Sequence, residues 1–196
     1  MKNENQHIEI LSDKLQKLEC PKEKILELDL GCGKGNFSTE LAQKYPDRII
    51  ISTDIMIGRL RKLVKRNQRL SLDNCRFIRC EAWHLLNQCI DDSSIYRIHI
   101  LCPDPWPKEK HKPFRLISSE LVSRLALKLQ LNGIFHFSTD DKFYFESTLN
   151  IIGKADFFKR ADFLINDILE IKTDFERKWN EMGLEVYHAA WQKVSQ

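Results

Sequence analysis

The chain has 196 residues, a formal net charge of +3 and 42% hydrophobic residues, values typical of one globular domain. No apolar run approaches the roughly 20 residues that a membrane span needs, and the polar first residues do not resemble a secretory signal. We therefore expect a cytoplasmic protein with no membrane partner, and the composition leaves monomer and homodimer equally open.

Strand and helix patterns alternate along the chain from about residue 25. An amphipathic helix is predicted before that point, over 5–19, so we divide the chain into an N-terminal helix or arm (1–24) and a domain (25–196). Strands are predicted at 25–30, 48–53, 75–80, 95–102, 134–139, 162–166 and 184–192. Helices are predicted at 37–45, 57–70, 83–89, 114–130, from 141 onward and at 174–182, with a turn at 132–133.

This alternation predicts a single α/β domain with a doubly wound, Rossmann-like parallel sheet covered by helices on both faces. Ligands of such sheets bind at the carboxyl ends of the strands. Polar and glycine residues directly after the predicted strands are therefore the candidate site residues.

A glycine-rich turn, DLGCGKG, follows the first predicted strand. Gly31 and Gly33 allow the backbone to turn tightly and to approach a ligand closely. The spacing is GxGxG, and Asn36 occupies the position where a dinucleotide-binding GxGxxG motif would have its third glycine. Asp29 would repel a pyrophosphate but attract an ammonium group, which favours S-adenosylmethionine over a dinucleotide.

Acidic residues follow the next two predicted strands. Asp54 is placed to accept hydrogen bonds from ribose hydroxyls, and its alternative role is to cap the helix predicted from residue 57. Glu81 is placed to meet the adenine amino group in the same series.

The segment PDPWPK after the fourth predicted strand is the most distinctive in the sequence. Its three prolines stiffen a loop in which Asp104 and Lys108 would be held in position. Trp106 has two interpretations, a stacking surface for a base or packing beneath the loop. Basic residues continue to Arg115, and the range 59–79 has eight Lys or Arg and one acid, which fits either a polyanionic partner or a solvated helix face.

Metal binding is not expected. No two of the six cysteines form a CxxC pair, so we interpret them as reduced, mostly buried thiols. The histidines are also predicted not to cluster at ligand spacing; they are His84, His99, His111, His136 and His188.

From about residue 25 to the C-terminus the sequence resembles the bacterial-type tRNA (guanine-N7)-methyltransferase family. The resemblance is carried by DLGCGKG, NCRFIRCEA, PDPWPKEKHKPFRL, STDD and TDFERKWNEMG. It implies a class I methyltransferase fold, a mostly parallel seven-stranded sheet with an antiparallel C-terminal strand. It also implies S-adenosylmethionine as methyl donor, S-adenosylhomocysteine as product, and methylation of the guanosine at position 46 in the tRNA variable loop.

The resemblance assigns roles to individual residues. Cofactor binding falls on Asp29, Gly31, Gly33, Asp54, Glu81 and Asp104, and Asp104 is also the catalytic residue. Substrate binding falls on Lys108, Asp140, Thr173 and Glu176, and RNA binding on Lys110, His111, Lys112 and Arg115. The family usually has Glu at positions 29 and 54, Asp at 81, and more basic residues at 113–114.

Guanine N7 has a free lone pair and no proton, so the enzyme needs to align the base rather than deprotonate it. Asp104, with Glu176, is expected to accept hydrogen bonds from guanine N1 and N2. Three alternatives stay open: methylation of an exocyclic amino group, carbon-5 methylation through a Cys102 thiolate, and a tRNA-binding module without activity.

Overall fold

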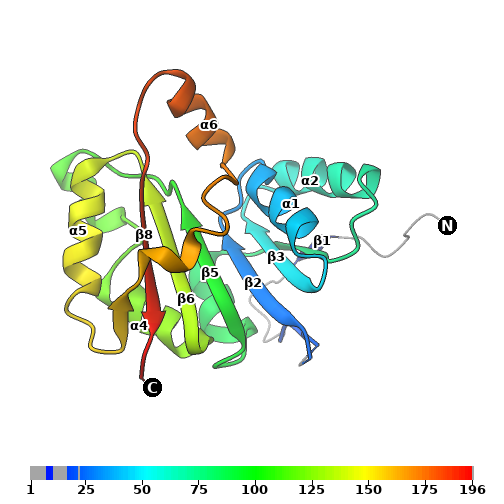
Figure 1. Cartoon of the computed structure of the whole chain (residues 1–196), viewed down its shortest axis with the longest axis horizontal. Coiled ribbons are helices and arrows are strands. Elements are labelled where there is room, and N and C mark those ends of the chain that lie inside the picture. The colour runs from blue at the N-terminus through cyan, green and yellow to red at the C-terminus, as the bar shows by residue number, and fades with distance from the viewer. Residues whose placement is uncertain (1–7, 11–16, 22, 196) are drawn as a thin grey trace.

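The computed structural model describes residues 8–10, 17–21 and 23–195 of the chain. Strands in these residues form one sheet (Figure 1). They are β1 (Ile8–Ile10), β2 (Ile25–Leu30), β3 (Arg48–Asp54), β4 (Cys75–Arg79), β5 (Ile95–Leu101), β6 (Leu129–Thr139), β7 (Phe158–Arg160) and β8 (Tyr187–Lys193). The order is β1-β4-β3-β2-β5-β6-β8-β7. Neighbours from β1 to β6 are parallel, whereas β8 is antiparallel to both β6 and β7.

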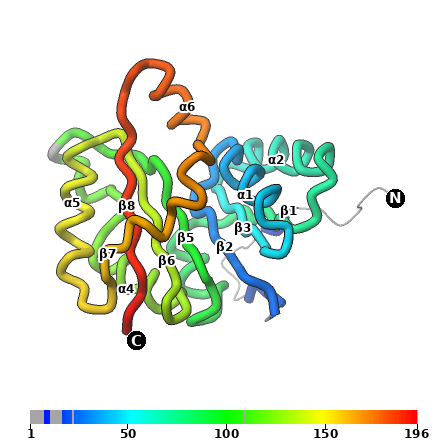
Figure 2. The backbone as a smooth tube through the Cα atoms, in the orientation of Figure 1, coloured from blue at the N-terminus to red at the C-terminus, as the bar shows by residue number. Residues whose placement is uncertain are grey.

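Helices cover both faces of the sheet (Figures 1 and 2). The α-helices are α1 (Asn36–Lys44), α2 (Ile57–Arg69), α3 (Ala82–His84), α4 (Ser119–Lys128), α5 (Lys142–Ile152) and α6 (Asp174–Glu181). A π-helix, η1 (Leu85–Cys89), continues α3, and two 3-10 helices are η2 (Glu109–Phe114) and η3 (Asp162–Ile165). No helix in the described ranges is long and apolar enough to cross a membrane.

Two hydrophobic cores lie on opposite faces of the sheet. Side chains of α1, α2 and η3 form one core, and side chains of η1, α4 and α5 form the other. Because successive strand residues point to opposite faces, Ile50 belongs to the first core and Ile51 to the second. In β2 the same alternation directs Leu28 to the α4 side and both Glu27 and Asp29 to the α1 side.

The predicted doubly wound, mostly parallel sheet with an antiparallel C-terminal strand is confirmed, with one strand more than the seven expected. β1 and β7 are not predicted, and the strand predicted over 162–166 is absent. β1 lies in the range 5–19 where a helix is predicted; the helix prediction is wrong for residues 8–10 and 17–19, and 5–7 and 11–16 lie outside the described residues. β1 pairs with β4, and Glu9 accepts hydrogen bonds from the Arg76 guanidinium at 2.9 and 2.6 Å. These cross-strand contacts outweigh the helical periodicity of the sequence.

Three other local predictions are corrected. The strand predicted over 162–166 is instead η3, because the Asp162 carboxylate accepts the Ala190 N–H, at 2.9 Å, and ends the pairing of β7 with β8. The helix predicted over 114–130 begins only at Ser119, where the Ser118 hydroxyl caps it. The turn predicted at 132–133 lies inside β6 and accompanies a shift of its register with β5.

Candidate active site

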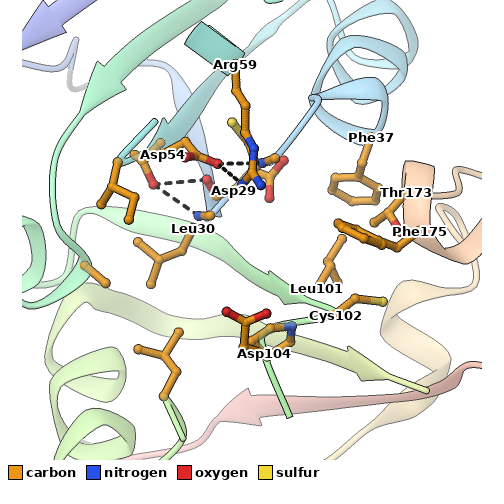
Figure 3. Close-up of a pocket in the computed structure, with 18 of the residues that line it drawn as sticks. Asp29, Leu30, Phe37, Asp54, Arg59, Leu101, Cys102, Asp104, Thr173 and Phe175 are labelled. Carbon is orange, nitrogen blue, oxygen red and sulfur yellow. Dashed lines mark hydrogen bonds and ion pairs between the residues drawn. The ribbon is translucent and has the colours of Figure 1, made fainter. Parts of the chain in front are cut away.

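A cavity of about 600 Å³ lies at the carboxyl ends of β2, β3, β4 and β5, where the sheet rule places a ligand. The beginning of α6 forms another part of its wall. Figure 3 shows Asp29 and Asp54 on one side of this space and Asp104 on the other. The predicted site residues on the wall are Asp29, Gly31, Gly33, Asp54, Glu81, Asp104, Asp140 and Thr173; Lys108 and Glu176 are not on it.

The glycine loop presents bare backbone to the cavity. Gly31, Gly33 and Gly35 have φ values of +84°, +58° and +72°, in the left-handed region that favours glycine. A Cβ on Gly35 would lie 2.5 Å from the Leu63 side chain, so this glycine lets α1 approach α2. A Cβ on Gly31 or Gly33 would meet nothing within 4 Å, so ligand atoms have room at these two positions.

Asp29 is a buried carboxylate, only 3% exposed, at the end of β2. The Ser38 hydroxyl of α1 donates a hydrogen bond to it. Burial raises the pKa of the Asp29 carboxyl to about 7; the Ser38 hydrogen bond opposes this rise, and the nearby Asp54 carboxylate adds to it. The single Ser38 hydrogen bond does not offset the burial of the Asp29 carboxylate, so a cationic group in the cavity would stabilise its ionised form.

Asp54 ties the glycine loop to the start of α2. Its carboxylate accepts the Arg59 guanidinium at 3.2 Å (Figure 3), the Gly33 N–H at 3.1 Å and the Met56 N–H at 2.7 Å. The N-cap of α2 is Met56, so the alternative of Asp54 as the capping residue is wrong. Glu81, at the N-cap of α3, is an exposed carboxylate on the cavity wall.

The proline-rich loop after β5 fixes Asp104 in place. Cys102 and Trp106, two residues on either side of Asp104, have φ values of +48° and +44°, a strained conformation for residues other than glycine. The Arg115 Nε–H donates to the Pro105 carbonyl at 2.7 Å. The Asp104 side chain is exposed and forms no hydrogen bond or ion pair with any residue that the structure describes.

Three aromatic rings lie beside this loop. The Trp106 ring is 5.6 Å from the His111 ring and 5.5 Å from the Phe114 ring. Trp106 and Phe114 also line the cavity and are 37% and 63% exposed. Trp106 therefore packs in the loop, and part of its ring is exposed, as the predicted stacking against a base requires.

The predicted RNA-binding residues divide into two kinds. The side chains of Lys108, Lys110 and Lys112 are exposed along η2. The Arg115 guanidinium lies 4.7 Å from the Tyr144 ring and donates to Pro105, so Arg115 braces the loop.

Glu176 does not lie on the cavity wall, although it is predicted to contact the substrate. It is 2% exposed and sits in the first turn of α6, where its N–H donates to the Thr173 hydroxyl at 3.0 Å. Its carboxylate accepts hydrogen bonds from Lys172 at 2.6 Å and from His188 at 3.0 Å. Burial acts to raise the pKa of Glu176, but these two partners outweigh it and lower that pKa.

A chain of three histidines connects Glu176 to Glu27 across the sheet. Glu27 Oε2 lies 3.0 Å from His99 Nε2, and His99 Nδ1 lies 3.1 Å from His136 Nδ1. His136 Nε2 in turn lies 3.1 Å from His188 Nδ1. The prediction excludes a cluster at metal-ligand spacing; these three histidines instead form hydrogen-bond contacts with one another, because β5, β6 and β8 bring them together from distant parts of the sequence.

The contacts of the histidine chain between Glu27 and Glu176 determine how many protons it needs. Four contacts join the two carboxylates, each needs one proton, and three neutral imidazole rings carry only three. Glu27 is ionised at neutral pH, because His99, Arg97 and Arg48 outweigh its burial and hold its pKa at about 2. Burial lowers the pKa of His99 and, more strongly, that of His136. When the other three contacts each have their proton, the contact left for the fourth proton joins His188 to Glu176.

Comparison with known proteins identifies the family. A family model described as "Putative methyltransferase" matches residues 23–189. The chain is 29% identical over 167 residues to the tRNA (guanine-N(7)-)-methyltransferase of Thermotoga maritima, covering 85% of this chain and 53% of that protein. It is 31% identical over 172 residues to the protein of the same name from Neisseria gonorrhoeae, covering 85% and 69%.

This chain belongs to the tRNA (guanine-N7-)-methyltransferase family. It spans about half the length of the Thermotoga protein and about two thirds of the Neisseria protein. A methyltransferase from Streptococcus mutans, solved in complex with S-adenosylhomocysteine, has the same fold, with a TM-score of 0.57, 13% identity and coverage of 92% of this chain and 91% of that chain. S-adenosylhomocysteine is what remains of S-adenosylmethionine after it has lost the methyl group bonded to its positively charged sulfur.

The cavity of this family member fits S-adenosylmethionine. The buried Asp29 carboxylate matches the ammonium of its amino-acid part, and the bare backbone at Gly31 and Gly33 leaves space for a bulky ligand. Sequence reasoning missed other residues on the wall, among them Phe37, Arg59 and Phe175. Arg59 carries a usable signal, since it lies five residues after Asp54 on the helix that Asp54 precedes.

Proposed function

We propose that the protein transfers the methyl group of S-adenosylmethionine to N7 of the guanosine at position 46 in the tRNA variable loop, forming 7-methylguanosine. The observation that carries this proposal is Asp104, a carboxylate that pairs with no described residue and that faces the acidic cofactor wall across the cavity from a rigid loop (Figure 3). Because tRNA is the proposed substrate, we place the reaction in the cytoplasm.

Asp29, Asp54 and Glu81 hold the cofactor in this proposal. Asp29 pairs with the ammonium, Asp54 accepts from the ribose hydroxyls, and Glu81 meets the adenine amino group. Three donors already occupy Asp54, and a carboxylate has about four acceptor positions. A second hydroxyl therefore displaces the Arg59 guanidinium, the longest of the three contacts at 3.2 Å and the one whose side chain is exposed to solvent.

Asp104 orients the base. Its carboxylate accepts hydrogen bonds from guanine N1–H and N2–H, which directs the N7 lone pair toward the methyl group. Bound S-adenosylmethionine would supply the methyl group together with a positive charge, which the base would carry after the transfer. Asp104 stabilises that charge and takes no proton. Thr173, Asp140 and the beginning of α6 surround the base, and Glu176 positions α6 from behind the wall.

The tRNA chain lies along η2. Lys108, Lys110 and Lys112 contact phosphates, which contribute affinity but no sequence selection. The exposed rings of Trp106 and Phe114 stack on the unpaired target base or its neighbour. The exposed basic residues of α2 form a second basic surface; they are Arg61, Lys62, Lys65 and Arg69.

The test is methyl transfer from labelled S-adenosylmethionine to unmodified tRNA, followed by nucleoside analysis. We expect 7-methylguanosine in wild-type tRNA, none in a tRNA with adenosine at position 46, and none with Asp104→Ala enzyme. Asp156→Ala, an exposed acid on another surface, is the matched control and retains activity. An N2-methylated or 5-methylated product would overturn the proposal, as would tight cofactor binding without transfer to any tRNA.

A further inference from the structure

Two cysteines and a histidine meet behind the cofactor cavity. Cys80 follows β4, His84 ends α3, and Cys89 ends η1. One ligand atom from each residue lies within 4.8 Å of the others. The sequence spacing is C-x3-H-x4-C, which contains no CxxC pair and so did not indicate a metal site.

The local backbone explains how these residues meet. α3 widens into the π-helix η1, in which the Ile90 N–H donates to the Leu85 carbonyl, five residues earlier, at 3.2 Å. This wide turn brings His84 and Cys89, also five residues apart, to the same side as Cys80. π-turns are rare and occur often at functional sites, because their backbone is less stable than an α-helix.

The cluster is buried and one of its polar atoms is unsatisfied. Cys80 and Cys89 are 6% and 0% exposed. His84 Nε2 is buried and has no hydrogen-bond partner among the described residues. Burial raises the pKa of the Cys80 thiol to about 12 and also raises that of Cys89, so neither is a reactive thiolate while the site lacks positive charge.

We propose that Cys80, His84 and Cys89 form a binding site for a borderline-soft divalent cation, of which Zn²⁺ is the best match. Two thiolates and one imidazole are ligands that Zn²⁺ prefers, and a bound cation supplies the charge that ionises the thiols. Three protein ligands leave one position of a tetrahedron, which water fills. This proposal is independent of the proposed methyl transfer.

The location of the cluster gives the cation a structural role. Cys80 and its neighbours Glu81, Ala82 and Trp83 line the cofactor cavity. A cation that joins the end of β4 to η1 would fix the backbone that carries Glu81. Loss of the cation should therefore weaken cofactor binding and lower the melting temperature without changing which nucleoside is made.

The experiment uses the full chain and Co²⁺ as a spectroscopic substitute for Zn²⁺. Metal analysis of protein purified under reducing conditions should find zinc near one equivalent per chain. After exchange, Co²⁺ should give thiolate-to-metal absorption that Cys80→Ser, Cys89→Ser and His84→Ala each weaken or remove. Cys75→Ser changes a buried cysteine of the opposite core and should leave this absorption intact.

Circular dichroism of each variant separates loss of the site from loss of the fold. A substoichiometric metal content together with no Co²⁺ absorption in folded wild-type protein would overturn the proposal. So would absorption that survives in a folded Cys80→Ser, Cys89→Ser double variant. A mass two hydrogens lighter than the reduced chain, lost on reduction and absent from both the Cys80→Ser and the Cys89→Ser variant, would overturn the proposal in favour of a disulfide between these two cysteines.

Discussion

On the β2–β3 wall of the cavity, Asp29 and Asp54 are buried and hydrogen-bonded to Ser38, Gly33 and Met56. On the opposite wall, Asp104 is exposed and has no partner among the described residues. The two acids of the cofactor wall therefore already have hydrogen-bond partners in the protein, whereas the wall proposed for the base leaves its key carboxylate to be paired by the substrate. This difference predicts that damage to the first wall changes cofactor affinity and that damage to the second changes turnover.

The largest expected effect separates the two walls. Asp104→Asn should lower kcat for tRNA by about 10²–10³-fold, because it removes an interaction that strengthens as the base becomes cationic. The dissociation constant for S-adenosylmethionine, measured by calorimetry, should change by less than about tenfold. If the variant had a normal kcat and bound the cofactor weakly, Asp104 would be a cofactor-binding residue and would not orient the base.

The second effect concerns Glu27, the carboxylate at one end of the histidine chain. Glu27→Gln should lower the free energy of unfolding by about 3 kcal/mol, because Arg48 and the buried His99 ring lose their carboxylate partner. The pKa of Glu27 is about 2 in the folded chain, below its ordinary 4.5, so its stabilisation is full above pH 4.5 and is lost as the pH falls toward 2. Urea unfolding at pH 7 and pH 3 should show the loss in wild-type protein but a smaller change in the variant.

The third effect tests the proton count on the substrate side. His188→Ala should remove a charge-assisted hydrogen bond from Glu176 and cost about 2 kcal/mol of stability. Nitrogen NMR of the wild-type protein at pH 7 should find four protons on the ring nitrogens of His99, His136 and His188, one for each contact in the histidine chain. Three neutral rings at that pH would mean that Glu176 carries the fourth proton.

The fourth effect is a pH dependence on the cofactor side. The pKa of Asp29 is about 7 without ligand, and only its ionised form attracts an ammonium, so cofactor affinity should fall about tenfold for each pH unit below about 7. Calorimetry from pH 5 to pH 8 measures the slope. Asp29→Asn should bind weakly and without this slope, and an unchanged slope would assign the dependence to another group.

The smallest effect concerns the RNA surface. Lys110→Ala should weaken tRNA binding a few-fold and reduce the slope of log affinity against log salt by about one. Lys154→Ala is the matched control, because this exposed lysine follows α5 at the opposite end of the sheet. Equal salt slopes for both variants would remove η2 from the RNA surface.

Local pattern was enough to predict most of the cofactor wall. Glycines and acids placed directly after apolar strand patterns determine where a parallel sheet binds its ligand, because all such strands end at one edge. The positions of Asp29, Gly31, Gly33, Asp54, Glu81 and Asp104 on one cavity follow from this rule and are confirmed. Their individual roles stay predictions.

The sequence alone therefore determined the doubly wound sheet, the edge that holds the site and the family to which the chain belongs. Tertiary structure decided which distant residues touch: β1 joined the sheet through Glu9 and Arg76, and the histidine chain crosses strands up to 72 residues apart in a single contact. It also decided that Glu176 lies off the cavity wall and that Cys80, His84 and Cys89 lie close together. Periodicity records which side of its own element a residue faces, whereas these contacts depend on how the elements pack against one another.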